Sequence, residues 1–185
     1  MKSVGFVILT WNSEQYISKC LDSILKIDSL NVHIAVTDNG SSDKTVEILK
    51  DYQAKYPNIL VTYLKKNGGT TKPRNIAIKL LPKVDYIVVL DSDAFIDDKE
   101  NFVEIFKVLD DHLEYGIIGP KLSNLSGDLQ PSGRNLPRFR DKLAKVSLSK
   151  KRRKRAEERE TVDYSKQPDL FPVGYLMSAC WAFKY

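Results

Sequence analysis

An α/β fold with a mostly parallel central sheet is predicted for this chain of 185 residues. Apolar runs rich in β-branched residues begin at Val4, Val32, Ile59 and Tyr86, which are 27 or 28 residues apart. Between successive runs, apolar residues recur with the period of a helix. Alternation of strand and helix at this spacing is typical of βα units, which build parallel sheets.

Each element can be placed from its pattern. Val4–Leu9 is uninterrupted, as expected for a strand that is buried on both faces. A further helix is predicted after Asp98, followed by a short apolar run at 115–120, loops over 121–142 and a last apolar segment at 170–183. The four helical stripes consist of Tyr16, Ile17, Cys20, Leu21, Ile24 and Leu25; Val46, Ile48, Leu49 and Tyr52; Ile76, Ala77, Leu80 and Leu81; and Phe102, Ile105, Phe106 and Leu109.

Composition excludes several classes of protein. With 42% hydrophobic and 29% charged residues, the chain can bury a core, which excludes a disordered tail. Cys20 and Cys180 are too few for a disulfide framework or a four-cysteine zinc site. No apolar run reaches the roughly 20 residues that span a bilayer, and the first residues do not resemble a signal peptide. We therefore expect a cytoplasmic protein.

The net charge of +5 is concentrated in one segment. Residues 138–160 hold 11 Lys/Arg and 4 Asp/Glu, a local net charge of +7, which leaves −2 for the rest. Such a run can bind nucleic acid or an anionic membrane, or it can be a solvated helix or loop. No aromatic residue interrupts 150–155, so no nucleic acid partner is expected. Leu143, Val146 and Leu148 provide a weak apolar side, so peripheral contact with an anionic membrane through 142–155 stays open.

Polar clusters follow three of the predicted strands. They are Thr10-Trp11-Asn12-Ser13-Glu14, Asp38-Asn39-Gly40-Ser41-Ser42-Asp43 and Asp91-Ser92-Asp93. Each has a simple structural explanation, because Asn12 or Ser13, and Ser41 or Ser42, could cap the helix that follows. In parallel sheets, however, the carboxyl ends of the strands share one edge, and ligands bind there. Three clusters on that edge favour a binding site.

Of the three clusters, the one with Asp91 and Asp93 points to the most specific ligand. Two carboxylates that follow a buried strand repel each other unless a cation joins them, and Mg²⁺ or Mn²⁺ with substrate phosphates is the usual choice. Asp38 is a candidate acceptor for a base N–H or a ribose hydroxyl. Arg74, near a helix start that includes Pro73, can face a phosphate. The sequence therefore predicts a metal–diphosphate site.

The motifs together resemble the nucleotide-sugar-binding half of a family 2 glycosyltransferase of rhamnosyltransferase-like type. Leu9-Thr10-Trp11-Asn12 is similar to the first motif, and 38–45 matches Asp-Asn-x-Ser-x-Asp-x-Thr throughout. Asn67-Gly68-Gly69 and Pro73-Arg74-Asn75-Ile76-Ala77 resemble the third motif, with Pro73 and Ala77 replacing the usual Ala and Gly. Asp91-Ser92-Asp93 is the Asp-x-Asp motif, and Ser178-Ala179 stands where a Gly-Ala strand is usual. The resemblance implies the GT-A fold, a Rossmann-like α/β/α sandwich.

The resemblance also implies roles for individual residues. The donor would be a sugar linked to UDP or dTDP, and the acceptor a glycan or lipid-linked hydroxyl in cell-surface polysaccharide or glycolipid synthesis. Transfer would invert the anomeric centre, with Mn²⁺ or Mg²⁺ assisting. Asp93 would act through the metal, with Asp91 as a second ligand that also approaches the ribose. The other donor-binding residues would be Thr10, Trp11, Asn12, Glu14, Asp38, Asn39, Arg74 and Ser92.

The same resemblance predicts an incomplete enzyme. Residues 1–120 would form the donor-binding domain, and 121–185 the start of an acceptor-side region that includes the basic segment 138–160. The family's general base is a carboxylate that would lie beyond Tyr185. Asp97, Asp98, Asp163 and Asp169 do not match its position. We therefore expect donor binding by this chain and doubt that it is active alone.

Two alternatives belong to other classes. A phosphatase of the haloacid dehalogenase type would use Asp91 and Asp93, but it normally has Thr or Val where Phe95 stands and carries the motif near its N-terminus. A binding module that uses the basic segment on membrane or nucleic acid would leave the three edge clusters unexplained. A dinucleotide-dependent oxidoreductase is disfavoured because no Gly-x-Gly-x-x-Gly follows the first strand.

Overall fold

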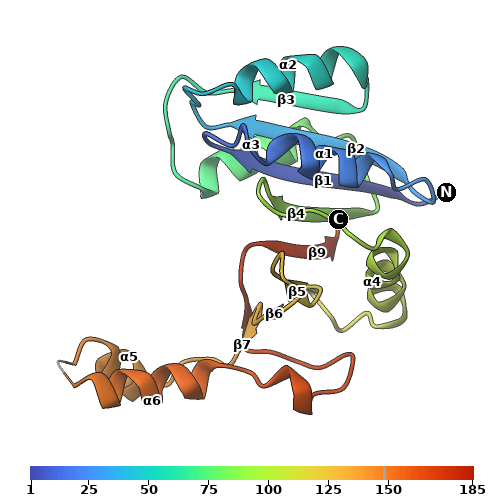
Figure 1. Ribbon diagram of the computed structural model, residues 1–185. Helices are drawn as coiled ribbons and strands as arrows, with labels where there is room; N and C mark the ends of the chain where they lie inside the picture. Colours follow the sequence, from blue (N-terminus) through green and yellow to red (C-terminus); the bar gives the residue numbers. More distant parts are fainter. Residues whose placement is uncertain (148) are drawn as a thin grey trace. The chain divides into compact units, whose positions relative to one another are not determined.

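The computed structural model describes residues 1–147 and 149–185, so Leu148 lies outside the described residues (Figure 1). Its chain forms two compact units. Unit 1 consists of Met1–Ile118 and Ser178–Tyr185, and unit 2 of Gly119–Met177. These units differ from the expected ranges 1–120 and 121–185 at the C-terminal end. The reason is that β9 (Cys180–Lys184) pairs with β4 (Tyr86–Asp91) of the central sheet.

Unit 1 is built on a five-stranded sheet with the order β3-β2-β1-β4-β9. The first four strands in the chain are β1 (Ser3–Thr10), β2 (Asn31–Asp38), β3 (Ile59–Tyr63) and β4, and they pair in parallel. β9 is antiparallel to β4. The four strands predicted from the sequence are therefore confirmed, and so is the fold class, a mostly parallel sheet flanked by helices.

Helices cover both faces of this sheet (Figure 1). They are α1 (Ile17–Leu25), α2 (Thr45–Lys55), α3 (Thr71–Leu80) and α4 (Lys99–Asp111). On one face, Ala77 of α3 joins Val7, Ala35 and Ile87 in a buried cluster. On the other face, Phe102 of α4 stacks on Phe6 with ring centroids 6.1 Å apart. Consecutive strand residues thus face opposite helix layers, which is why Val4–Leu9 is apolar throughout.

The helix caps suggested by the sequence are not formed. The residues before α1 and α2 are Tyr16 and Lys44, and neither makes a side-chain capping bond. Asn12, Ser13, Ser41 and Ser42 therefore do not cap these helices. Their side chains instead make hydrogen bonds to other loops at the carboxyl edge of the sheet.

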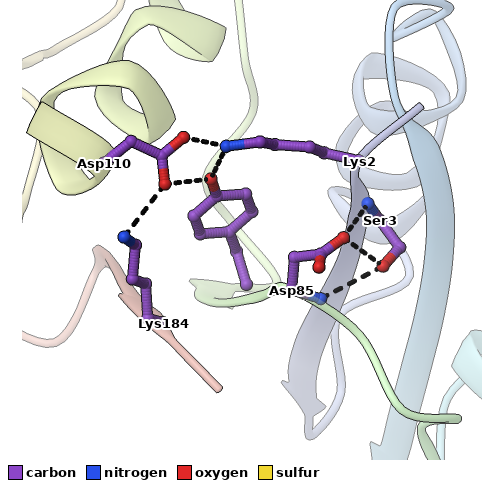
Figure 2. A network of polar contacts seen from close by, with 6 residues as sticks. Lys2, Ser3, Asp85, Asp110 and Lys184 are labelled. Carbon is purple, nitrogen blue, oxygen red and sulfur yellow. Dashed lines mark hydrogen bonds and ion pairs between the residues drawn. The ribbon is translucent and has the colours of Figure 1, made fainter.

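A polar network joins strands and helix α4 at the other end of the sheet, where the parallel strands β1 and β4 begin (Figure 2). Asp110 of α4 pairs with Lys2 and, at 3.0 Å, with Lys184 of β9. The buried Tyr86 donates its hydroxyl proton to the same carboxylate over 2.7 Å. Nearby, Asp85 accepts from the backbone N–H of Ser3 at 2.7 Å. One helix carboxylate thus contacts the ends of β1, β4 and β9.

Unit 2 contains short elements where the sequence predicts loops. Its two larger helices are α5 (Phe139–Lys145) and α6 (Lys150–Glu160), so the basic run is helical. Among the described residues, no helix is both long and apolar enough to cross a membrane. The smaller elements are β5 (Leu122–Ser123), β6 (Leu129–Gln130), β7 (Gly133–Arg134), β8 (Tyr175–Leu176) and a 3₁₀ turn at Tyr164–Lys166.

Candidate functional site

The three polar clusters meet at one edge of the sheet, as the sequence predicts. In the parallel register, Thr10 of β1 lies opposite Asp38 of β2. On the other side of β1, Leu9 lies opposite Asp91 of β4. The carboxyl ends of these three neighbouring strands therefore bring the clusters together, in the position where open α/β sheets bind ligands.

Asp38 organises the loop that follows β2. Its carboxylate is 1% exposed and accepts four hydrogen bonds. The hydroxyls of Thr10 and Ser41 donate to Oδ1 at 3.1 and 2.5 Å. The backbone N–H groups of Gly40 and Ser41 donate to Oδ2 at 3.2 and 3.0 Å. Because both oxygens are engaged, contact with a nucleotide base would require one of these bonds to be exchanged.

Gly40 is required by the same loop. Its φ is +80°, a left-handed conformation that side chains rarely adopt. A Cβ atom there would lie 2.9 Å from the backbone of Lys66. The second position after Asp38 must therefore be glycine for the loop to close against the next one.

The cluster after β1 is bonded to the loop after β2. Asn12 adopts a φ of +52° and accepts the N–H of Ser42 at 2.9 Å. Glu14 accepts the N–H of Lys44 at 2.9 Å. Trp11 is 56% exposed, which leaves its ring available to stack on a flat ligand. Asn12 and Glu14 thus act in the first place as supports for the loop.

Asn39 connects the loop after β2 to the third motif through hydrogen bonds. Its side chain is buried and donates to the carbonyl of Gly69 at 2.9 Å, while its Oδ1 accepts the N–H of Gly68 at 2.8 Å. These bonds hold the loop that leads into α3, where Pro73 and Arg74 lie in the first turn, as predicted. Arg74 then reaches the end of β4 and donates to Asp91 Oδ1 at 2.7 Å.

Asp91 and Asp93 differ in their surroundings. Burial raises the pKa of Asp91, and the negative charge of Asp93 raises it further against the opposing effect of Arg74. Asp93 is exposed, and within the described part of the chain its carboxylate makes no hydrogen bond or ion pair. Asp93 is therefore the carboxylate that remains free to bind a ligand.

These two carboxylates can be compared with what a divalent cation needs. Among residues 1–147 and 149–185, no group of three or more His, Cys, Asp or Glu is suited to hold a metal. Mg²⁺ usually takes only one or two protein carboxylates and completes its shell with water and substrate phosphates. Asp93 and the second oxygen of Asp91 are therefore the carboxylate oxygens that this edge offers to a cation bound to a diphosphate.

Several residues support the Asp91–Asp93 turn, and one of them, Ser23, was missed in the sequence. The hydroxyls of Ser13 and Ser92 lie 2.9 Å apart, and Ser23 of α1 accepts the N–H of Ile96 at 3.0 Å. The N–H of Asp91 donates to the carbonyl of Ala179 at 2.9 Å, so the Ser178-Ala179 motif borders the site. Ser23 is buried beside the apolar stripe of α1. A polar residue at such a position in the sequence could have indicated that its side chain has a hydrogen-bond partner in the fold.

Cys20 also borders this turn from α1. Its thiol lies 3.8 Å from the carbonyl oxygen of Asp91. Burial, with the negative charges of Asp93 and Asp91 adding to it, raises the pKa of Cys20 to about 12. The pKa of Cys180, also buried, is raised to about 12 by burial and by Asp91. Both thiols therefore stay protonated at neutral pH and act as packing groups.

Comparison with known proteins identifies relatives. The sequence model of the family described as Glycosyl transferase family 2 matches residues 6–167. The poly(ribitol-phosphate) beta-N-acetylglucosaminyltransferase TarS of Staphylococcus aureus is 34% identical over 115 residues, 60% of this chain and 20% of TarS. The poly(ribitol-phosphate) beta-glucosyltransferase of Bacillus spizizenii is 40% identical over 96 residues, 50% of this chain and 15% of that protein.

Solved structures agree with these matches. S. aureus TarS 1–349 in complex with UDP-GlcNAc aligns with a TM-score of 0.57 and 31% identity, over 77% of this chain and 38% of that one. The mannosyltransferase PcManGT from Pyrobaculum calidifontis aligns over 99% of this chain and 44% of its own, with a TM-score of 0.62; at 18% identity it supports the GT-A fold alone. The chain spans less than half the length of each relative named above. Since the family model covers most of its residues, the chain belongs to glycosyl transferase family 2.

Proposed function

We propose that the chain binds a UDP- or dTDP-linked sugar at the carboxyl edge of β1, β2 and β4, and serves as the donor half of an inverting glycosyltransferase. The observation that carries the proposal is the convergence of four motifs on this edge, ending in Arg74, Asp91 and the free carboxylate of Asp93. The likeness to TarS in complex with UDP-GlcNAc supports a nucleotide-sugar donor.

In this proposal, some site residues support the loops and others contact the ligand. Asp38, Asn39, Asn12 and Glu14 hold the loops, with Thr10 and Ser92 bonded to their frame. Trp11, Arg74, Asp91 and Asp93 face the ligand: the indole ring stacks on the base, Asp91 approaches the ribose, and Arg74 directs its remaining N–H groups to a phosphate. Asp93 with Asp91 would hold Mn²⁺ or Mg²⁺, which would supply positive charge to stabilise the diphosphate as it departs.

The acceptor side is proposed from chemistry. An acceptor hydroxyl attacks the anomeric carbon from the side opposite the diphosphate and passes its proton to a carboxylate base. Within the described residues, Asp98 is committed to capping α4, where it accepts the N–H of Asn101. Asp98 is therefore not proposed as the base. Loss of sugar transfer in an Asp98→Ala variant that still folds and binds the donor would contradict this assignment.

The names of the relatives and the state of the cysteines suggest the class of acceptor and the cellular location of the reaction. Two of them are named for transfer to poly(ribitol-phosphate), which supports a cell-surface glycan or lipid-linked polymer as the acceptor. Both cysteines are free, as is usual in the reducing cytoplasm. We therefore place the reaction on the cytoplasmic side of the membrane, with no role for nucleic acid.

Family membership displaces the alternative functions. A dehalogenase-type phosphatase would use Asp91 as a nucleophile, but Asp91 pairs with Arg74 in a chain of a different family. A module that only binds membrane or nucleic acid through its basic segment would not need the edge site.

Thermal unfolding with UDP, dTDP and GDP, each with and without Mn²⁺, tests the donor site. A pyrimidine diphosphate with Mn²⁺ should stabilise the protein by about 3 kcal/mol at a hundredfold excess over its Kd. Asp93→Ala should abolish the contribution of Mn²⁺, and Asp97→Ala, which removes an exposed carboxylate of the same loop, should retain it. Absence of any shift with both UDP and dTDP would reject the donor site. An equal loss in both variants would reject the role of Asp93.

A further inference from the structure

Three large apolar side chains of unit 2 are exposed in a row on α5. Phe139, Leu143 and Val146 are 79%, 55% and 82% exposed. Their spacing of four and three residues places them on one face of a helix, within about 60° of arc. Val146 keeps helical dihedral angles at the C-cap and therefore continues the row. Single exposed apolar residues are ordinary, but an aligned row is typical of a contact surface.

The second helix of the unit does not cover this row. Asp141, on the opposite face of α5, is buried and pairs with Arg159 of α6. Lys145 pairs with the buried carboxylate of Glu160 over 2.7 Å. These two ion pairs fasten α6 along the other side of α5 and leave the apolar row uncovered within the described part of unit 2.

Positive charge surrounds the row. Arg140 and Lys142 are exposed and flank it on either side of α5. Unit 2 as a whole has 14 Lys/Arg and 7 Asp/Glu, a net charge of +7, whereas unit 1 has 15 and 17, a net charge of −2. The positive charge of the protein therefore lies in the unit that exposes the apolar row.

The cations of α6 are not explained by the stability of the helix. Residues 150–155 occupy its N-terminal half, where the helix dipole disfavours positive charge and like charges three or four residues apart repel. In the described part of the chain none of these six side chains forms an ion pair with a carboxylate. An anionic surface would relieve both costs.

We infer that unit 2 docks on a lipid bilayer that contains anionic lipids. Phe139, Leu143 and Val146 enter the boundary between headgroups and acyl chains, and Arg140 and Lys142 extend to the headgroup phosphates. The cations of α6 add attraction over about a Debye length, roughly 10 Å. A soluble polyanion would leave the apolar row without a partner, and a neutral apolar partner would leave the charge unused. An anionic lipid surface matches both, and the inference does not depend on the donor site.

Flotation of the full chain with vesicles tests the inference. Vesicles of phosphatidylcholine with phosphatidylglycerol should carry the protein to the top of the gradient, and vesicles of phosphatidylcholine alone should not. The triple variant Phe139→Ser, Leu143→Ser, Val146→Ser should reduce the partition coefficient at least about tenfold, since three inserted side chains are lost. Leu125→Ser, which removes an apolar side chain of the same unit that is also highly exposed, should bind like the wild type.

A fluorescence measurement keeps the test independent of flotation. Phe139→Trp should show a blue shift of its emission on anionic vesicles, and Leu125→Trp should not. Equal flotation of wild type and triple variant would overturn the inference. Binding to inorganic polyphosphate without binding to vesicles would overturn it in favour of a polyanion site. Dimerisation through the row, lost in the triple variant and without lipid binding, would overturn it in favour of a protein interface.

Discussion

Asp38 shows how a motif residue can serve a site through the backbone. The family resemblance assigns this carboxylate to the nucleotide, yet it is buried and accepts four hydrogen bonds from Thr10, Gly40 and Ser41. Buried acceptors bonded in this way are expensive to remove, because each donor is then left unsatisfied in a low dielectric. Its first contribution is therefore the shape of the loop.

Removal of this carboxylate is expected to destabilise the fold. Asp38→Ala should lower the free energy of unfolding by about 3 kcal/mol, since buried hydroxyl and N–H donors lose their acceptor. Urea denaturation measures the change. Asp51→Ala, on the exposed side of α2, is the matched control and should stay within about 0.5 kcal/mol of the wild type. A similar value for both variants would show that the loop does not depend on Asp38.

The ion pair between Arg74 and Asp91, unlike the bonds of Asp38, matters for the arrangement of charge at the site rather than for stability. It is partly exposed on both sides, so it adds little to stability. Its effect is to place a guanidinium beside two carboxylates at the edge where four motifs meet. This arrangement supports the proposal that the edge binds a ligand with phosphate groups, which a guanidinium can contact.

At the scale of elements, α4 is joined to the sheet by rings on its apolar face and by one carboxylate near its end. Phe102 and Phe106 pack on Phe6 and Tyr86, with the latter ring centroids 4.7 Å apart. Asp110 then contacts Lys2, Tyr86 and Lys184, which belong to or border three strands (Figure 2).

Loss of this carboxylate should loosen the ends of the strands. Asp110→Ala is expected to cost about 1–2 kcal/mol, mostly because the buried Tyr86 hydroxyl loses its acceptor. The neighbouring variant Asp111→Ala, at an exposed position of the same helix, should have almost no effect. Thermal unfolding of the two variants side by side measures the difference. Equal melting temperatures would refute a stabilising role for the network.

At the scale of the whole molecule, the last residues complete the sheet of the first unit. β9 covers the edge of β4, and its Cys180 and Ala182 are buried. The segment also brings the carbonyl of Ala179 to the N–H of Asp91. Residues far apart in the chain thus form one site-bearing sheet, and unit 2 is an insertion between its strands.

Deletion of residues 178–185 should therefore damage unit 1. We expect a loss of about 3 kcal/mol or more from the apolar surface that β9 buries, together with aggregation through the uncovered edge of β4. Unfolding curves and light scattering measure these effects. Removal of Tyr185 alone, which is largely exposed, should leave both properties near those of the full chain. A truncated chain as stable and monomeric as the full one would contradict this role of β9.

Unit 2 was the hardest part of the chain to predict. Its strands have two residues each, so they leave no periodic pattern, and 121–142 was predicted only as loops. The pairing of α5 with α6 depends on Asp141 with Arg159 and Lys145 with Glu160. Charged residues at such separations cannot be paired from sequence, because a basic run offers many equivalent partners.

The sequence by itself determined the α/β class, the four parallel strands and the edge on which the polar clusters lie. These follow from local periodicity and from the common direction of parallel strands. Only the tertiary structure decided that Asp38 and Asn39 support loops, that Arg74 pairs with Asp91, and that β9 closes the sheet. Each of these depends on which polar groups or strands meet across the fold, and the choice among partners is made by packing and burial rather than by pattern.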